Sequence, residues 1–301
     1  MTGTIQVARE ISYASSAATR GGRAVIRAIE NATGRLSLIR RARGYERDLA
    51  LGRDFWDVIC ARYGISLEVA VGSLDAIPSE GPLVLVANHP YGILDGLVMG
   101  RILSARRGGD FRIVAHNVFR RAPDLERVIL PISFDETREA AAQNLATRAE
   151  ALRYLSRGGA IGIFPGGTVS TAARPMGPPL DPVWRNFTAK MIARSDATVV
   201  PLFFEGHNSR LFQIASHIHS TLRLGMLLRE FRSRVGTPVR IVVGRPIPRA
   251  ALDAHAGDPT AMMDFLRKAT YDLSPEPLAA RGLGHEFEAR YKARDGGGHL
   301  R

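Results

Sequence analysis

The chain has 301 residues, of which 45% are hydrophobic and 23% are charged. This composition supports a sizeable hydrophobic core and excludes disordered, collagen-like and disulfide-dense proteins. Lysine and arginine total 41 against 29 acidic residues, for a net charge of +12. We therefore expect a basic surface that attracts anions such as acidic lipids, nucleic acid or acidic proteins.

The single cysteine and the lack of long apolar runs bear on the compartment. Cys60 lies in an apolar stretch and has no second cysteine to pair with, which predicts a buried thiol in a reducing compartment. The first thirty residues lack a signal-peptide core. No run reaches the roughly 18 apolar residues that a membrane span requires. We expect a cytoplasmic protein that meets the inner face of the cell membrane only peripherally.

Four segments are predicted along the chain. Residues 1–64 form a helical N-terminal arm, and residues 65–250 form the main domain. Residues 251–292 form a C-terminal helical extension. Residues 293–301 contain three consecutive glycines and are expected to be a disordered tail.

The N-terminal arm contains a predicted basic amphipathic helix over residues 20–43. Arginines alternate there with a proposed apolar stripe made of Val25, Ile29, Ala32, Leu36 and Ile39. The stripe either packs on the main domain or lies in an anionic membrane interface, and the two interpretations are evenly balanced. A second basic helix is predicted over residues 223–235, with Arg223 among its arginines, and here packing is favoured over lipid contact.

The main domain alternates between short apolar runs and longer helical patterns. Strands are predicted at residues 83–87, 112–115, 160–164, 198–204 and 239–243, and helices at residues 95–104, 136–155, 183–194, 209–222 and 259–273. Such alternation is typical of an α/β domain with a largely parallel sheet flanked by helices. Sites in these domains gather where strands end and loops begin.

A histidine and an aspartate stand at the first of these strand ends. Asn88 and His89 follow the strand over residues 83–87, and Asp95 opens the next helix. In this geometry a carboxylate can hold an imidazole in one tautomer, so that the imidazole can remove a proton from a hydroxyl. The alternative interpretation, in which Asp95 caps the helix and His89 is an ordinary loop residue, carries comparable weight on this motif alone.

Two further motifs follow in a fixed order. A strand runs into Phe-Pro-Gly-Gly-Thr at residues 164–168, and Val-Val-Pro follows at residues 199–201. With the Asn-His and Asp before them, these motifs make residues 65–250 resemble the lysophospholipid acyltransferase superfamily, which includes the 1-acyl-glycerol-3-phosphate acyltransferases. The resemblance implies transfer of an acyl group from a thioester to a lipid hydroxyl, with His89 as general base and Asp95 as its orienting partner.

The resemblance also implies the partners and the remaining site residues. The donor is acyl carrier protein or a coenzyme A thioester, the acceptor is a lysolipid on an anionic membrane surface, and no metal or other cofactor is expected. Backbone N–H groups of Gly92 or of Gly166 and Gly167 are candidates to stabilise the oxyanion. The predicted substrate-binding residues are Asn88, Tyr91, Gly92, Gly166, Gly167, Thr168, Ser170, Asn208 and Arg174.

The chain departs from the family pattern in two places. Five residues separate His89 from Asp95 where the family commonly has four, and a bulge at Gly92 is predicted to absorb the extra residue. Gly166 and Val169 stand where the family usually has glutamate and arginine. That arginine is thought to contact the acceptor phosphate, and its loss favours an acceptor without a phosphate.

Residues 206–209 read Gly-His-Asn-Ser and resemble the bacterial branch that contains haemolysin-related and ornithine-lipid O-acyltransferases. A lyso-aminolipid such as lyso-ornithine lipid is therefore the expected acceptor. Arg174, Arg185 or Lys190 could replace the missing arginine, although each is equally well read as a surface charge. Asn208 and Ser209 are read first as a helix N-cap.

Three alternatives stay open. The chain could be a 1-acylglycerol-3-phosphate acyltransferase, or a lipid-binding relative without catalytic activity. A nucleic-acid binder is the third, and it is disfavoured because no zinc-ligand spacing, RNA-stacking motif or recognition helix accompanies the positive charge.

Overall fold

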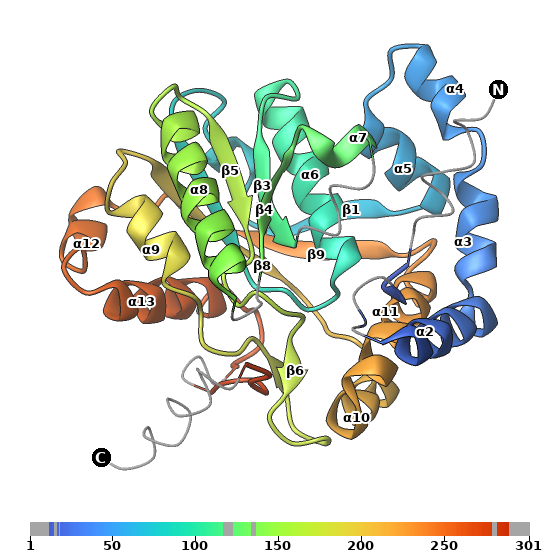
Figure 1. Ribbon diagram of the computed structural model, residues 1–301. Coiled ribbons are helices and arrows are strands. Elements are labelled where there is room, and N and C mark those ends of the chain that lie inside the picture. Colours follow the sequence, from blue (N-terminus) through green and yellow to red (C-terminus); the bar gives the residue numbers. More distant parts are fainter. Residues whose placement is uncertain are drawn as a thin grey trace.

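The computed structural model describes residues 12–14, 17, 19–116, 123–133, 137–278 and 282–288. Its centre is a seven-stranded sheet in the order β1-β9-β8-β2-β5-β3-β4 (Figure 1). All neighbouring strands run parallel except β8 and β9, which are antiparallel. The strands are β1 (Ser66–Val71), β2 (Leu83–Ala87), β3 (Arg112–His116), β4 (Ile129–Ile132), β5 (Ala160–Ile163), β8 (Thr198–Phe204) and β9 (Pro238–Val243). The predicted α/β class with a largely parallel sheet is confirmed.

The middle of the sheet is built from uninterrupted apolar runs. Every residue of β2 and of β5 is buried, as expected for strands covered on both faces. β2 pairs with β5 on one side and with β8 on the other. Their carboxyl ends therefore meet at one edge, where the segments after residues 87, 163 and 204 emerge together.

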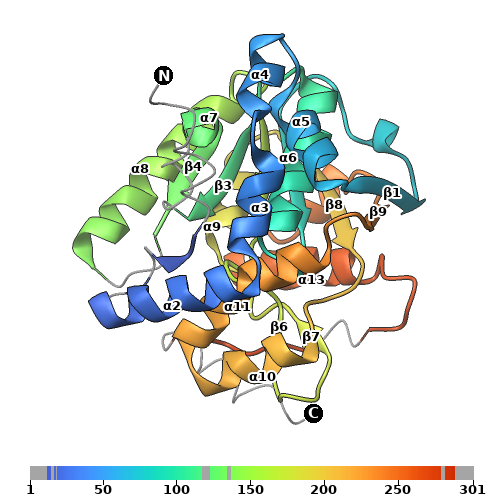
Figure 2. The ribbon, with the colours of Figure 1, turned by 90° about the vertical axis from the view of Figure 1, so that its right-hand side faces the viewer.

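Helices cover both faces of the sheet (Figures 1 and 2). One core cluster packs α5, α6 and α11 against the sheet, and the other packs α8, α9 and α13 against the opposite face. A two-stranded hairpin, β6 (Thr171–Ala172) and β7 (Pro179–Leu180), lies outside the sheet. The helices are α2 (Arg20–Thr33), α3 (Arg35–Ala42), α4 (Tyr45–Ala50), α5 (Phe55–Tyr63), α6 (Ile93–Arg107), α7 (Pro123–Glu126), α8 (Arg138–Leu155), α9 (Phe187–Ile192), α10 (Arg210–Ile218), α11 (Ser220–Ser233), α12 (Arg249–Asp253) and α13 (Pro259–Tyr271), and η2 (Leu74–Ala76) is a 3₁₀ turn.

The predicted basic helix over residues 20–43 differs from the structure in two respects. Gly34 has φ +135° and separates α2 from α3, and a Cβ there would lie 2.0 Å from Cδ of Arg232. The proposed stripe is confirmed only in part: Ile29 and Ile39 pack against the core, but Val25 and Leu36 are 47% and 55% exposed while Ile26 is buried. Packing against α11 decides which side of α2 is covered.

One predicted helix and two strands also differ from the sequence-based prediction. The helix predicted over residues 209–222 is broken at His219, whose extended backbone ends α10 and caps α11. Strands β1 and β4 were not predicted: β1 lies at the sheet edge with mixed exposure, and β4 is four residues long and contains Pro131. The predicted tail over residues 293–301 lies outside the described residues.

None of the helices in the described ranges combines the length and the apolar character that a bilayer span requires.

Candidate active site

Asn88 fixes the exit of the central strand. Its side-chain Nδ2 donates to the carbonyl of Phe204 at 2.9 Å, and its Oδ1 accepts from the N–H of Phe204 at 2.7 Å. The side-chain amide thus extends the hydrogen-bonding pattern between β2 and β8 by one residue. The next residue, His89, is placed at the edge where the strands end.

His89 and Asp95 meet in the folded chain. Nδ1 of His89 lies 2.9 Å from Oδ2 of Asp95, whose side chain is fully buried. The same Oδ2 accepts backbone N–H groups of Tyr91 at 2.8 Å and Gly92 at 2.9 Å, so Asp95 also caps α6. Asp95 therefore contacts the imidazole and caps the helix at the same time.

The alignment of this pair is incomplete. The ring nitrogen is within hydrogen-bonding distance, but the angle between the two groups leaves Nδ1 without a well-directed acceptor. Catalytic hydrogen bonds are often poorly aligned before substrate binds and tighten in the complex.

Gly92 forms the turn between His89 and Asp95. Its backbone has φ +92° and ψ −115°, a conformation that glycine adopts readily and other residues rarely do. A Cβ at this position would lie 3.2 Å from Cγ2 of Val169. The turn brings Asp95 back toward His89 despite the longer spacing.

The surroundings suit His89 to act as a base. Its ring stacks on Phe164, with centroids 4.3 Å apart and planes 22° apart. In the part of the chain that the structure describes, no group hydrogen-bonds to Nε2. Burial raises the pKa of Asp95, opposed by the histidine and by the two backbone N–H groups. A carboxylate beside Nδ1 and an unoccupied Nε2 are what proton removal from a hydroxyl requires.

Asp181 holds the backbone of His89, and the sequence analysis did not predict it as a site residue. Its Oδ1 accepts the backbone N–H of His89 at 3.1 Å and the hydroxyl of Ser170, and its Oδ2 accepts Nε1 of Trp184 at 2.9 Å. The backbone N–H of Ser170 in turn donates to the carbonyl of His89 at 2.8 Å. Asp181 belongs to no recognisable motif, and a lone acidic residue in the apolar segment after β7 was the only signal.

Of the three backbone N–H groups proposed to stabilise the oxyanion, those of Gly167 and Gly92 are already engaged. The N–H of Gly167 donates to the carbonyl of Phe164 at 3.0 Å, and that of Gly92 is bound to Asp95. Neither is free to bind an oxyanion in this conformation, which corrects the expectation for both. A Cβ at Gly166 would lie 3.3 Å from Cβ of Asp181, so the glutamate typical of the family would be crowded there.

Tyr91 anchors the loop that carries His89. Its hydroxyl donates to the carbonyl of Glu205 at 2.7 Å, and burial raises its pKa to about 12. Gly206 allows this contact, because a Cβ there would lie 2.0 Å from the Tyr91 hydroxyl oxygen. The first residue of the Gly-His-Asn-Ser motif therefore serves the loop that carries His89.

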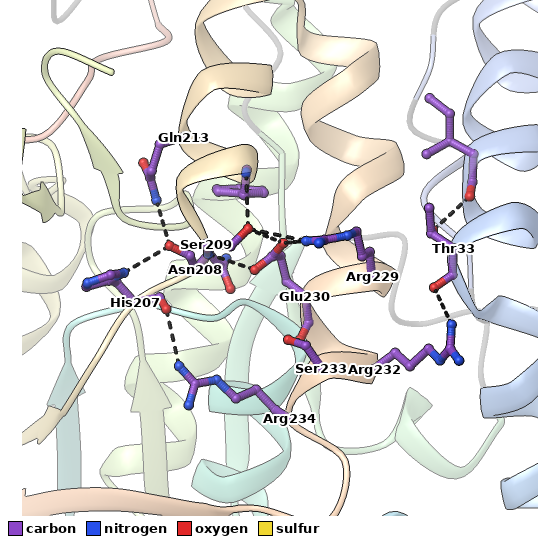
Figure 3. A network of polar contacts seen from close by, with 12 residues as sticks. Thr33, His207, Asn208, Ser209, Gln213, Arg229, Glu230, Arg232, Ser233 and Arg234 are labelled. Carbon is purple, nitrogen blue, oxygen red and sulfur yellow. Dashed lines mark hydrogen bonds and ion pairs between the residues drawn. The ribbon is translucent and has the colours of Figure 1, made fainter. Parts of the chain in front are cut away.

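The rest of that motif joins α10 to α11 (Figure 3). The Ser209 hydroxyl accepts the N–H of Phe212, which confirms the predicted N-cap. Ser209 also donates its N–H and its hydroxyl to the carboxylate of Glu230, both at 2.7 Å. The carbonyl of Asn208 accepts Nε2 of Gln213 at 3.4 Å, while the buried Nδ2 of Asn208 has no acceptor among the residues that the structure describes.

The cations suggested as substitutes for the missing arginine are placed differently. Arg185 is buried and paired at 2.8 Å with Glu286 and Glu288. Arg174 is exposed on the turn of the β6–β7 hairpin, and Lys190 is exposed on α9. The structure brings another residue to the loop instead: Nη2 of Arg223 donates to the Thr168 hydroxyl at 2.7 Å.

Cys60 is buried, and burial raises the pKa of its thiol to about 11, which disfavours a nucleophilic role. Within the described ranges, no group of three His, Cys, Asp or Glu side chains is arranged to hold a metal ion.

Two cavities flank the site: one of about 410 Å³ is lined in part by Phe164 and Gly167, and one of about 520 Å³ by Asn88 and Tyr91.

A mostly parallel α/β sheet with a His–Asp pair at its strand ends is an enzyme-like arrangement. The family model described as "Acyltransferase" matches residues 39–279. The chain belongs to this acyltransferase family.

Curated relatives and a solved structure resemble the chain over most of its length. It is 25% identical over 229 residues to the lyso-glycine lipid O-acyltransferase of Phocaeicola vulgatus, covering 74% of this chain and 78% of that protein. It is 27% identical over 231 residues to the protein of the same name from Bacteroides thetaiotaomicron, covering 74% and 80%. The 1-acyl-sn-glycerophosphate acyltransferase of Thermotoga maritima aligns with a TM-score of 0.43 at 14% identity, over 88% of this chain and 87% of that chain.

Proposed function

We propose that this acyltransferase transfers a fatty acyl group from a thioester to the hydroxyl of a lysolipid. The observation that carries the proposal is the 2.9 Å approach of His89 Nδ1 to the fully buried Asp95. Nε2 of His89 takes the proton of the acceptor hydroxyl as its oxygen attacks the thioester carbonyl. The C–S bond then breaks, and the proton passes from His89 to the departing thiolate.

The acceptor is an amino-acid lysolipid in this proposal, with lyso-ornithine lipid as one example. Val169, at the position of the family arginine, packs into an apolar cluster with Phe212, Met226 and Leu227, so this position supplies no charge for a phosphate. Both curated relatives are named for a lyso-glycine lipid. These two facts support an acceptor without a phosphate over 1-acylglycerol-3-phosphate.

The donor is acyl carrier protein or a coenzyme A thioester. The cavity of about 410 Å³ adjoins Phe164, on which His89 stacks, and Arg148 and Lys190 are among its lining residues. Both donors are anionic, and the net charge of +12 would attract either of them.

The protein docks on an anionic membrane surface through α10 in this proposal. One side of α10 exposes Leu211, Ile214 and Ile218, and the neighbouring hairpin exposes Met176. A hydrogen bond of 2.6 Å from Arg210 to the carbonyl of Gly177 ties the hairpin to the helix. Figures 1 and 2 show α10 and β6 together at the same end of the molecule. An apolar stripe beside arginines matches an interface with acidic lipids.

The test compares the wild type with His89→Ala and with His255→Ala, a control on the far side of the fold. Each protein receives labelled acyl carrier protein or acyl-coenzyme A together with amino-acid or phosphate lysolipids, and mass spectrometry detects the diacyl product. Product from the wild type and His255→Ala, with at least a hundredfold loss in His89→Ala, is the expected result. Equal turnover by His89→Ala would exclude His89 as the base. No product from any pair would favour a lipid-binding protein.

A further inference from the structure

Arg223 is a buried arginine that no carboxylate of the described residues neutralises. Its side chain lies on α11 and the residue is 8% exposed. Nη2 donates to the Thr168 hydroxyl at 2.7 Å and to the carbonyl of Val169 at 3.1 Å, whereas the enclosed Nε has no acceptor within the described ranges. Among the described residues, no carboxylate forms an ion pair with this guanidinium.

Arg185 shows how the same chain treats another arginine of equal burial. Arg185 is 9% exposed and is held by Glu286 and Glu288, each at 2.8 Å. Burying an unpaired charge is costly, so buried charges are normally paired. In keeping with this, burial lowers the pKa of Arg223 to about 10, which still leaves it cationic at neutral pH. A buried guanidinium without a carboxylate is arranged for an anion that arrives from outside.

The guanidinium lies against the glycine-rich loop after β5, which is hydrogen-bonded to the loop that carries His89. Thr168 and Val169 accept its hydrogen bonds, and the next residue, Ser170, donates its N–H to the carbonyl of His89. Val169 packs beside Gly92, in the turn between His89 and Asp95. An anion bound at Arg223 would therefore belong to a molecule that also reaches the catalytic loop.

Two aromatic rings hold the guanidinium in place. Its central carbon lies 4.5 Å from the centroid of Phe287 and 5.6 Å from that of Phe212. Stacking of this kind orients the planar fork of an arginine and reduces the entropy lost when it binds an anion.

We propose that Arg223 binds the carboxylate of the lysolipid acceptor and so selects acceptors built on an amino acid. The inference rests on the proposed acyl transfer and names the group that recognises its acceptor. An amino acid acylated on its nitrogen keeps a carboxylate, whose single negative charge and two oxygens match one guanidinium. In the described chain, Arg223 is the only cation that hydrogen-bonds to Thr168 or Val169, and a phosphate dianion would be left partly unneutralised.

The experiment measures equilibrium binding without any acyl donor. The probes are a short-chain N-(3-hydroxyacyl)glycine, its carboxamide, in which the charge is removed, and a lysophosphatidate of equal chain length. They are titrated into the wild type, Arg223→Gln, Arg223→Lys and Arg232→Gln. The last variant is the matched control, because Arg232 is exposed on the same helix.

The wild type and Arg232→Gln should bind the carboxylate about tenfold to a hundredfold more tightly than the carboxamide, as a charge-assisted pair provides. This ratio should fall to near one in Arg223→Gln, with carboxamide binding unchanged, and to an intermediate value in Arg223→Lys. Thermal melting of each variant without ligand checks folding. If Arg223→Gln does not fold, the decision rests on the reduced ratio in Arg223→Lys.

Retention of the full carboxylate preference by Arg223→Gln, or by Arg223→Lys if only that variant folds, would overturn the proposal. Tighter binding of lysophosphatidate by the wild type, lost in Arg223→Gln, would also overturn it by assigning the site to phosphate. The outcome is independent of catalysis. Selective carboxylate binding by a protein that forms no diacyl product would refute the proposed acyl transfer and leave the role of Arg223 intact.

Discussion

Asp181 accepts a hydrogen bond from the backbone N–H of His89, although 92 positions separate the two residues in the chain. Asp95 contacts the imidazole ring of the same histidine. The backbone of His89 is thus held by one carboxylate, and its imidazole lies beside another, so the position of this histidine depends on two separate parts of the fold.

Replacement of Asp181 by asparagine should weaken both the fold and the reaction. One oxygen becomes an NH₂ group that faces the donors of His89 and Ser170 or of Trp184, which should destabilise the protein by about 1–3 kcal/mol. We expect kcat to fall with little change in KM, because Asp181 positions the base and is not placed to contact substrate. Chemical denaturation and steady-state kinetics measure both effects. Asp253→Asn on α12 is the exposed control. An unchanged kcat in folded Asp181→Asn would refute the positioning role.

Replacement of Asp95 by asparagine should affect activity and stability in opposite directions. Burial raises the pKa of Asp95, so the folded state binds its proton more tightly than the unfolded state does. Its contribution to stability is complete at low pH and is lost as pH rises through the raised pKa. Asparagine resembles the protonated form and should raise the Tm at neutral pH, with a gain that shrinks toward about pH 4. Loss of the orienting charge should lower kcat roughly a hundredfold or more.

Thermal melts between about pH 4 and 7.5 test the stability effect. Asp57→Asn provides the control, since Asp57 is exposed in an ion pair with Arg101. A lower Tm for Asp95→Asn at neutral pH would contradict this prediction. It would mean that the hydrogen bonds from the N–H groups of Tyr91 and Gly92 stabilise the charged carboxylate by more than its burial destabilises it.

Gly206→Ala should disturb the site through Tyr91. The new methyl group would lie 2.0 Å from the tyrosine hydroxyl on a backbone with φ +92°, and strain and overpacking together should cost about 2–4 kcal/mol. Gly109→Ala is a matched control, because Gly109 also has positive φ, +85°, but a Cβ there meets no atom within 4 Å. Its cost should be the backbone strain alone.

The double variant Gly206→Ala with Tyr91→Phe separates the two contributions. Removing the hydroxyl relieves the overlap. The double variant should therefore lose less free energy of unfolding than the sum of the two single losses, by about 1–2 kcal/mol in chemical denaturation. Additive losses would show that the tyrosine is not the group that Gly206 accommodates.

Membrane binding should depend on the exposed side of α10. Leu211→Glu and Ile218→Glu each remove apolar contact and add a charge that acidic lipids repel, so binding to vesicles with anionic lipid should fall about tenfold or more. Binding of the wild type should weaken at high salt. Co-sedimentation measures both, with Leu145→Glu on α8 as the control for an exposed leucine elsewhere. An equal loss in the control would place the docking surface outside α10.

The sequence by itself determined the features that depend on neighbouring residues. Continuous apolar runs identified the buried strands β2 and β8, because a strand covered on both faces has no polar alternation. The glycine at position 92 indicated how the loop between His89 and Asp95 closes, because positive φ is a local property. The capping role of Ser209 followed from the same kind of short-range chemistry.

Only the tertiary structure decided the features that depend on which distant segments meet. Arg223 looked like one of several surface charges of a basic helix, and it is buried because α11 is covered by other parts of the chain. Asp181 has no motif, and its importance comes from the approach of the segment after β7 to His89. The covered side of α2 was predicted only in part for the same reason, because Ile29 is covered but Ile26 takes the place of Val25. Periodicity shows that a helix has an apolar side, but the neighbouring element selects the residues that lose contact with water.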